Sequence, residues 1–558
     1  MRLHRYTAPA LFAALAAAGA ALALCFAPYT VDDAFISWRY GANLVGSGVW
    51  NWNPSPSAVR VEAYTNPLYT ALSVVPALLG MPVELFFKLV SVGVLAGYVV
   101  AVVRLDVPRR QRLALCAFAL LSPVFFVHLF SGLETVSFAL LTAAPFALVA
   151  RHGRLGRLGH LACLGLAFSR PEGIALAAAA QAWGLVVGRR RRDLWGALAL
   201  GGALAAYWLL RAWYFGRFFP NTFYQKSTGH GGWIDGALGA GPVVWLPVGA
   251  AVLAVAALAG RWLLRADRER LRDATPLVLA VCAAVIHLGL YQASVLAMNY
   301  ADRFSWQILF PVAVVALVRP LTARTAPWSA AACALAAATA LSLEWHPVLA
   351  AAGALAGAAA VFGGARLRVP AVLALAAVAV ALVSVTPPRE LTAIAAYRYR
   401  LEYAHQALGR AVADDKEFRG TVAIGDAGIM PFCLGARHDV YDLRGLADPY
   451  LGRGPLPAEL LDRKVQMVVA VGRPYDPKGL RATTPTSLPL VKHAYAAGFE
   501  PAGRLQFTDT AWQSVLVRPG APAPGLKRAA RLARQENLRP DAAVVRDHLG
   551  ELPFLSQC

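Results

Sequence analysis

Residues 8–27 read APALFAALAAAGAALALCFA, an uncharged run that follows a short basic N-terminus. About 20 apolar residues are enough to cross the hydrocarbon core of a membrane as one helix. A secretory signal peptide begins in a similar way, but the length of this run favours a membrane span. We therefore expect residues 1–5 to be cytoplasmic and the chain to enter the membrane directly after them.

The composition agrees with a membrane protein. Apolar residues make up 58% of the chain and charged residues only 15%, against about 25% in soluble domains. The net charge of +21 would suit a nucleic-acid partner, but the arginines lie in short clusters between apolar runs. This pattern is typical of cytoplasmic loops, so we expect membrane lipids and no nucleic acid as partners.

Further apolar runs predict membrane spans at 83–104, 113–130, 135–150, 194–215, 241–263, 275–298, 304–319, 328–343, 347–363 and 369–387, with a short pair near 161–188. The apolar stretch 67–80 is too short to cross comfortably. Crossing would also place the basic cluster 104–112 outside, so we interpret 67–80 as a helix in the outer interface. The prediction is a polytopic α-helical protein of the plasma membrane with eleven to thirteen spans and its C-terminus outside.

The composition changes after Pro387, where charges return and apolar runs shrink to the length of strands. We expect a transmembrane domain over 1–387 and a soluble extracytoplasmic α/β domain over 388–558. Strands are predicted at 421–425, 465–471 and 514–517, with helices such as 394–413 between them.

Three features of this outer domain bear on function. Residues 526–539 form a basic amphipathic helix that could contact lipid headgroups, polysaccharide or the bundle, or simply present a solvated face. Asp426 lies between glycines, where it either binds an acceptor sugar or organises the turn. Cys433 and Cys558 are the two cysteines outside the apolar runs, and we hypothesise that they pair in an oxidising compartment.

The first outer loop begins with two adjacent carboxylates, Asp32 and Asp33, almost directly after the first span. Mutual repulsion and partial desolvation raise the pKa of one of them toward the value that a general base needs. The alternative is that Asp32 caps an amphipathic helix over 34–45. The spacing alone leaves both interpretations open.

Polar residues also gather at the outer ends of other spans, at 131–134, 169–173, 220–226 and 299–303. Ionisable residues that meet at one end of a bundle mark a substrate path, and arginine or lysine can hold a phosphate. For each one alone, the alternative is a snorkelling or ion-paired loop residue. We interpret His128 and His287, which lie within apolar runs, as packing residues rather than metal ligands.

These motifs carry a resemblance to a known family. DDAFISWRY (32–40), EAYTNP (62–67), SGLET (131–135), RPEG (170–173) and PNTFYQK (220–226) resemble the GT-C membrane glycosyltransferases. Within that superfamily the chain is most similar to the terminal arabinofuranosyltransferases of actinobacterial cell walls, which use decaprenyl-phosphate arabinofuranose. The resemblance covers roughly the first 300 residues and, in the outer domain, GDAG (425–428) and DLRGL (442–446).

The resemblance implies a GT-C fold and an inverting transfer of a sugar, arabinofuranose, from a polyprenyl-phosphate donor to a cell-envelope glycan. The catalytic base of the family maps onto Asp32 or Asp33. We expect the donor and acceptor site to include Arg39, Tyr40, Glu62, Tyr64, Asn66, Glu134, Arg170, Glu172, Asn221, Tyr224, Lys226, Asp302 and Arg303.

Several alternatives stay open at this point. Cationic side chains could stabilise the leaving phosphate without a cofactor, and a divalent cation held by Asp33 and Glu134 could do the same work. Another polyprenyl-linked sugar or a protein acceptor would suit the same chemistry. A lipid or glycan transporter is the rival class, but transporters tend to show internal repeats and substrate groups near the midplane of the bilayer.

Overall fold

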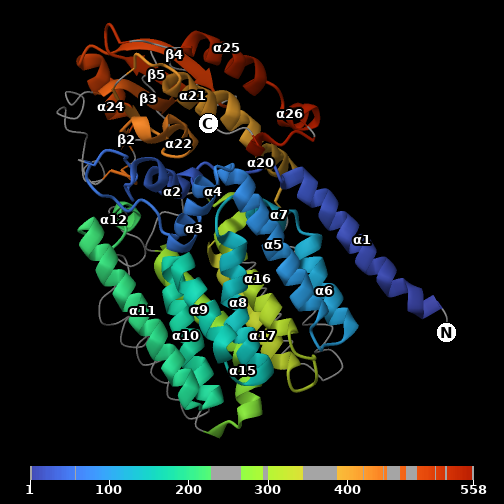
Figure 1. Cartoon of the computed structure of the whole chain (residues 1–558). Coiled ribbons are helices and arrows are strands. Elements are labelled where there is room, and N and C mark those ends of the chain that lie inside the picture. Colours follow the sequence, from blue (N-terminus) through green and yellow to red (C-terminus); the bar gives the residue numbers. More distant parts are fainter. Residues whose placement is uncertain are drawn as a thin grey trace, which may run out of the picture.

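The computed structural model describes residues 3–56, 58–227, 265–292, 299–343, 386–418, 420–443, 445–448, 465–472, 487–508, 511–521, 525–548, 550–555 and 558. Long helices form a bundle, and a small sheet with its own helices covers one end of it (Figure 1). The spans expected at 241–263 and 347–363 lie outside the described residues, as does nearly all of the one at 369–387.

The bundle is built from long helices that match the predicted apolar runs. They are α1 (Leu3–Phe26), α5 (Val83–Val103), α6 (Arg109–Leu120), α7 (Pro123–Phe130), α8 (Thr135–His152), α9 (Gly156–Ser169), α10 (Pro171–Gly188), α11 (Arg191–Phe215), α15 (Arg268–Gln292), α16 (Arg303–Leu317) and α17 (Ala326–Leu343). The short helix α12 (Asn221–Ser227) follows α11, and the 3-10 turn η1 (Tyr300–Asp302) precedes α16.

One predicted span is wrong in shape. The run 113–130 is divided between α6 and α7, which bend by 59° at their junction. Pro123 has no N–H to continue the helix, and the Ser122 hydroxyl instead caps α7 by accepting from the Phe125 N–H at 3.2 Å. The predicted short pair near 161–188 is present as α9 and α10, which meet at Arg170 in an extended backbone conformation.

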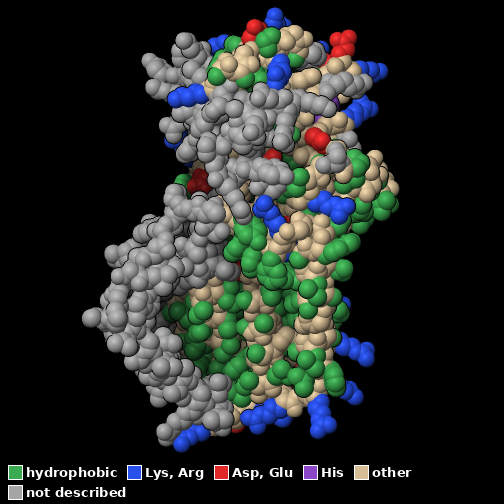
Figure 2. All heavy atoms as spheres, turned by 90° about the vertical axis from the view of Figure 1, so that its left-hand side faces the viewer, with side chains coloured by type: hydrophobic (Ala, Val, Ile, Leu, Met, Phe, Trp, Pro, Cys, Tyr) green, Lys and Arg blue, Asp and Glu red, His purple; other side chains and the backbone are tan. Residues whose placement is uncertain are grey.

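Three of the described helices are long and apolar enough to cross a membrane, namely α5, α8 and α11, and the bent pair α6–α7 is a fourth candidate. On the face seen in Figure 2, apolar side chains cover the middle of the bundle, and lysine and arginine gather at the end away from the sheet. This arrangement is the one expected for an apolar bundle in a bilayer with basic cytoplasmic loops. The full number of spans stays a prediction.

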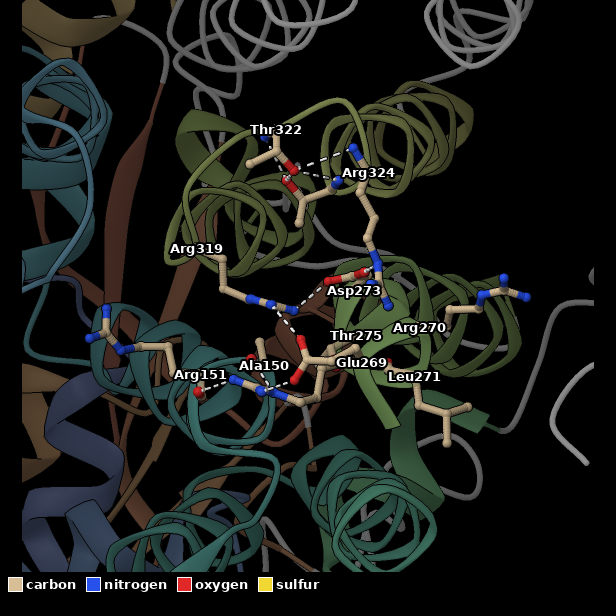
Figure 3. Close-up of polar contacts among 12 residues, drawn as sticks. Ala150, Arg151, Glu269, Arg270, Leu271, Asp273, Thr275, Arg319, Thr322 and Arg324 are labelled. Carbon is tan, nitrogen blue, oxygen red and sulfur yellow. Dashed lines mark hydrogen bonds and ion pairs between the residues drawn. The ribbon is translucent and has the colours of Figure 1, made fainter. Parts of the chain in front are cut away.

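The basic end of the bundle is held by ion pairs to a buried carboxylate (Figure 3). Asp273 at the start of α15 accepts from Arg319 and from Arg324, both at 2.5 Å. Both arginines lie in the segment that joins α16 to α17. The contacts therefore fix three helices to one another at this end.

Helices of the first outer loop lie between the bundle and the sheet (Figure 1). The predicted helix at 34–45 is α2 (Ala34–Ser47). The predicted interfacial helix at 67–80 is two short helices, α3 (Pro67–Leu72) and α4 (Val74–Leu79), divided at Ser73. Gly41 of α2 packs against Ser73 so closely that a Cβ atom would overlap it, which brings α2 into contact with both.

The C-terminal part begins with a continuous helical run, α20 (Pro388–Leu401), a π-helical turn (Glu402–Gln406) and α21 (Ala407–Ala413). The strands β1 (Thr421–Ile424), β2 (Val440–Asp442), β3 (Val465–Gly472), β4 (Glu500–Gln506) and β5 (Trp512–Val517) form one sheet in the order β2-β1-β3-β5-β4. β1 is parallel to β2 and β3, whereas β5 is antiparallel to β3 and β4. The remaining elements are α22 (Ile429–Leu434), η3 (Gly435–Arg437), α24 (Ser487–Ala496), α25 (Leu526–Asn537), α26 (Asp541–Asp547) and η5 (Pro553–Leu555).

Specific contacts join this part to the bundle. Arg398 of α20 forms a bidentate ion pair with Glu84 at the start of α5, with N–O distances of 2.9 and 2.8 Å. The disulfide hypothesis is confirmed, since Cys433 and Cys558 are bonded. The C-terminal part is therefore connected to the end of the bundle where the polar motifs lie.

Candidate functional site

A cavity lies at the end of the bundle that faces the sheet. It has an empty volume of about 620 Å³, counting open solvent at its mouth. Its polar lining comes from the first outer loop and from the ends of α8, α10, α12 and α16: Asp33, Ser37, Tyr64, Thr65, Asn66, Glu134, Arg170, Thr222 and Arg303. Segments far apart in the sequence thus supply one polar cavity.

Glu134 is the centre of the charged network in this cavity. Its carboxylate accepts from Asn66 at 2.7 Å, from Arg170 at 2.8 Å and from Arg303 at 3.1 Å. Burial opposes the ionised form, but Arg170 and Arg303 hold the pKa of Glu134 below its ordinary value. An ionised Glu134 therefore orients both guanidinium groups at the cavity wall.

Two members of the network, Glu134 and Arg303, directly follow backbone segments with positive φ angles. Glu134 follows Gly132, whose φ is +81° and where a Cβ atom would approach the Trp38 ring to 2.8 Å, so glycine is required. Arg303 follows Ala301 and Asp302, two non-glycine residues with φ of 47° and 49°. Such strained conformations cluster at functional sites.

The two arginines also make other contacts. Arg170 pairs with Glu172 at 2.5 Å, and Arg303 donates from Nε to the Thr135 hydroxyl at 3.1 Å. The guanidinium of Arg303 uses Nε and Nη2 in these bonds. Its planar fork is therefore fixed in orientation before any ligand arrives.

The two aspartates face different parts of the molecule. Asp33 lines the cavity, whereas the Asp32 carboxylate accepts from the Ile429 N–H at 2.8 Å, in the turn that follows β1. Neither side chain caps α2, since Asp33 occupies the N-cap position and its side chain makes no capping hydrogen bond to α2. The interpretation of Asp32 as a helix cap is therefore wrong.

The buried surroundings of Asp32 shift its pKa. Burial raises the pKa of Asp32 from 3.8 to about 6, and Asp426 and Asp33 add to the rise, while His405 and the Ile429 N–H oppose it. A carboxyl group that titrates near pH 6 can accept a proton at physiological pH and return it to solvent.

The sequence did not indicate a role for His405. This residue lies in the π-helical turn after α20, and its Nε2 is 3.1 Å from Oδ2 of Asp426. No local motif marks it, because its neighbours come from the first outer loop and from the turn after β1. For Asp426 the sequence leaves open whether it binds an acceptor sugar or organises the turn, and it does not indicate the contact with His405.

Several predicted site residues support the first outer loop instead of lining the cavity. Arg39 donates to the carbonyl oxygens of Trp52 at 2.7 Å and His438 at 3.1 Å, and to that of Pro431. Tyr40 donates to the Val61 carbonyl at 2.5 Å and accepts from the Ala63 N–H at 2.9 Å. Both are buried, and both tie the loop to its surroundings.

Another group gathers at a second, smaller pocket beside α11. Glu62 pairs there with Arg211. Asn221 donates to the carbonyl oxygens of Gly445 at 2.7 Å and Leu446 at 2.9 Å, and the Tyr224 hydroxyl accepts from the Phe219 N–H at 3.3 Å. The side chain of Lys226 lies outside the described residues, and Asp302 contributes the strained backbone turn before Arg303.

The residues around Glu134 do not fit a divalent cation. The Glu134 carboxylate already accepts three hydrogen bonds, two of them from guanidinium groups whose charge would repel a metal. In the described part of the chain, no group of three or more His, Cys, Asp or Glu side chains is arranged to hold a metal ion. The cationic groups that line this cavity are the guanidinium groups of Arg170 and Arg303.

Comparisons with known proteins give fold-level likenesses. No protein-family model and no curated protein matches the chain. It is similar to the crystal structure of ArnT from Cupriavidus metallidurans bound to undecaprenyl phosphate, at a TM-score of 0.46 and 17% identity, over 90% of this chain and 97% of that one. The crystal structure of ArnT in the apo state gives a TM-score of 0.47 and 16% identity, over 91% of this chain and 98% of that one.

Proposed function

We propose that the protein is a GT-C glycosyltransferase of the plasma membrane. It moves a sugar from a polyprenyl-phosphate donor to a glycan of the cell envelope, on the outer face of the membrane. The observation that carries the proposal is one cavity, at one end of an apolar bundle, that brings Asp33 together with Arg170 and Arg303. The sequence motifs that resemble GT-C enzymes supply most of the polar residues of this cavity.

The arginines suit the phosphate of the donor. Arg303 and Arg170 are anchored by Glu134, so their remaining N–H groups are oriented before the donor binds. The prenyl tail would lie along the apolar helices, and Lys226 of α12 is proposed as a further phosphate ligand.

The aspartate pair suits the acceptor. Asp32 or Asp33 removes the proton of an acceptor hydroxyl as its oxygen attacks the anomeric carbon of the sugar. The bond from that carbon to the phosphate oxygen breaks on the opposite side, and the phosphate leaves with the bonding electrons. Because attack and departure occur on opposite faces, the anomeric configuration is inverted. The guanidinium groups stabilise the charge that develops on the phosphate.

The sugar is proposed from the sequence resemblance. Terminal arabinofuranosyltransferases share the first-loop motif 32–40 and the motif 220–226, which favours arabinofuranose as the transferred sugar and arabinan as the acceptor. In this topology the N-terminus is cytoplasmic, and the part after Pro387 lies outside, next to the glycan.

The proposal is tested by incubating the purified full-length protein with polyprenyl-phosphate arabinofuranose, mannose and galactose and a synthetic arabinan acceptor. We expect acceptor-dependent release of polyprenyl phosphate from the arabinofuranose donor, with a product of inverted anomeric configuration by NMR. If the protein transfers mannose or galactose instead, the proposed enzyme class holds but arabinofuranose is the wrong sugar. Failure of folded protein to consume any of the donors would overturn the proposal.

A further inference from the structure

His405 occupies an unusual position in the helical run that follows Pro387. It lies in the π-helical turn Glu402–Gln406, and π-helical turns are rare and often mark functional sites. The side chain is 2% exposed. Its Nε2 contacts Asp426, while Nδ1 is buried without a hydrogen-bond partner among the described residues.

The turn after β1 connects His405 to the aspartate pair. Asp426, at one end of this turn, contacts His405, and Ile429, at the other end, donates its N–H to Asp32. Between them, Gly428 packs directly against the Asp32 carboxyl group. The turn lies at the carboxyl end of a strand with parallel neighbours on both sides, where ligands commonly bind in α/β sheets.

We propose that His405, held by Asp426, is a positioning residue that keeps Asp32 ionised, so that the outer α/β part completes the catalytic site. This inference rests on the proposed function. His405 acts through Asp32 and does not itself contact the reacting atoms. Its cationic form offers Asp32 a positive charge in a buried environment that otherwise holds the carboxyl groups of Asp33 and Asp426.

The pH at which Asp32 ionises depends on the charged and polar groups around His405 and the turn after β1. Asp32 and Asp33 face it from the first outer loop, Asp426 from the turn after β1, and the Tyr397 hydroxyl from α20. The Phe507 ring covers the imidazole at a centroid distance of 4.7 Å. Removal of the imidazole therefore leaves Asp32 beside carboxyl groups and apolar rings.

The test is the pH profile of kcat/KM for His405→Gln, which removes the charge and keeps an amide near Asp426. Loss of a nearby cation raises the pH at which Asp32 ionises, so we expect the acid limb of the profile to move up by about 0.5–1 pH unit. Turnover should fall several-fold below pH 6.5 and recover above pH 8, with an unchanged KM for the donor. A merely structural residue would lower turnover at every pH.

His438→Gln is the matched control, because His438 is a buried histidine of the same part whose Nδ1 contacts the Gly420 carbonyl at 3.3 Å. Its acid limb should coincide with that of the wild type. If His405→Gln unfolds in detergent, His405→Asn provides the same charge removal. An unshifted acid limb in a folded His405 variant contradicts this inference alone, whereas a wild type without turnover overturns the proposed function and this inference with it.

Discussion

Gly428 lies against the carboxyl group of Asp32, and a methyl group at Gly428 would overlap the Asp32 side chain. Gly428→Ala must therefore displace the proposed base or the turn that binds it. Because a shift of about 1 Å can lower catalysis by roughly 100-fold, we expect a loss of that order in kcat. Gly425→Ala is the control in the same turn, since a Cβ there would have its nearest contact at 3.5 Å. If Gly428→Ala and Gly425→Ala turn over at the same rate, Gly428 does not pack against the Asp32 carboxyl group as described.

Asp32→Asn should separate stability from activity. The pKa of Asp32 rises on folding from 3.8 to about 6, so the folded state binds a proton more tightly and loses stability as the pH rises through this range. The difference corresponds to about 3 kcal/mol. We expect Asp32→Asn to be inactive and, at pH 8, to unfold at a higher temperature than the wild type, with the advantage gone below pH 4. Asp414→Asn, at an exposed position, should leave both properties unchanged.

Arg303→Lys tests the anchored guanidinium at the cavity. Lysine keeps the charge but has one nitrogen in place of the Nε and Nη2 atoms that donate to Thr135 and Glu134, so its position is less defined. We expect kcat/KM for the donor to fall by roughly 10- to 100-fold. The same exchange at Arg319, which pairs with buried Asp273 at the opposite end of the bundle, is the control. Arg319→Lys should lower the unfolding temperature without changing the KM for the donor. An equal effect of Arg303→Lys and Arg319→Lys on this KM would refute the proposal that Arg303 binds the donor.

Glu84→Gln tests how the outer part is held on the bundle. The Glu84–Arg398 pair is buried, and removing one partner leaves an uncompensated charge. Breaking a buried pair in this way typically costs about 3–5 kcal/mol. We expect a clear fall in the unfolding temperature in detergent. Arg546→Gln removes an exposed pair with Asp547 and should have almost no effect. A similar stability of the two variants would show that the buried pair contributes little.

Much of the bundle could be predicted because apolar runs report membrane-length helices directly. The bend between α6 and α7 could not, since hydropathy continues across Pro123. In the outer part, the apolar strands β1, β3 and β5 were predicted. β2 was missed because it has only three residues, and β4 because it carries Glu500, Pro501 and Arg504.

The cavity was predictable to the extent that its residues lie at helix ends. Glu134, Arg170 and Arg303 each adjoin an apolar run, and helix ends on one side of a membrane meet in space. The role of Arg39 in binding carbonyl oxygens and the approach of Gly428 to Asp32 depend on how the C-terminal part packs on the bundle. Those contacts join segments hundreds of residues apart, and no local pattern encodes them.

The most direct test of the central claim is the initial rate of acceptor-dependent polyprenyl phosphate release in proteoliposomes, compared among the wild type, Asp32→Asn, Asp33→Asn and Asp414→Asn. We predict release by the wild type and by Asp414→Asn, and loss of at least 100-fold in both variants of the pair, in line with the roughly 10²–10⁴-fold contribution of a general base. Full turnover by Asp32→Asn and Asp33→Asn would contradict the account.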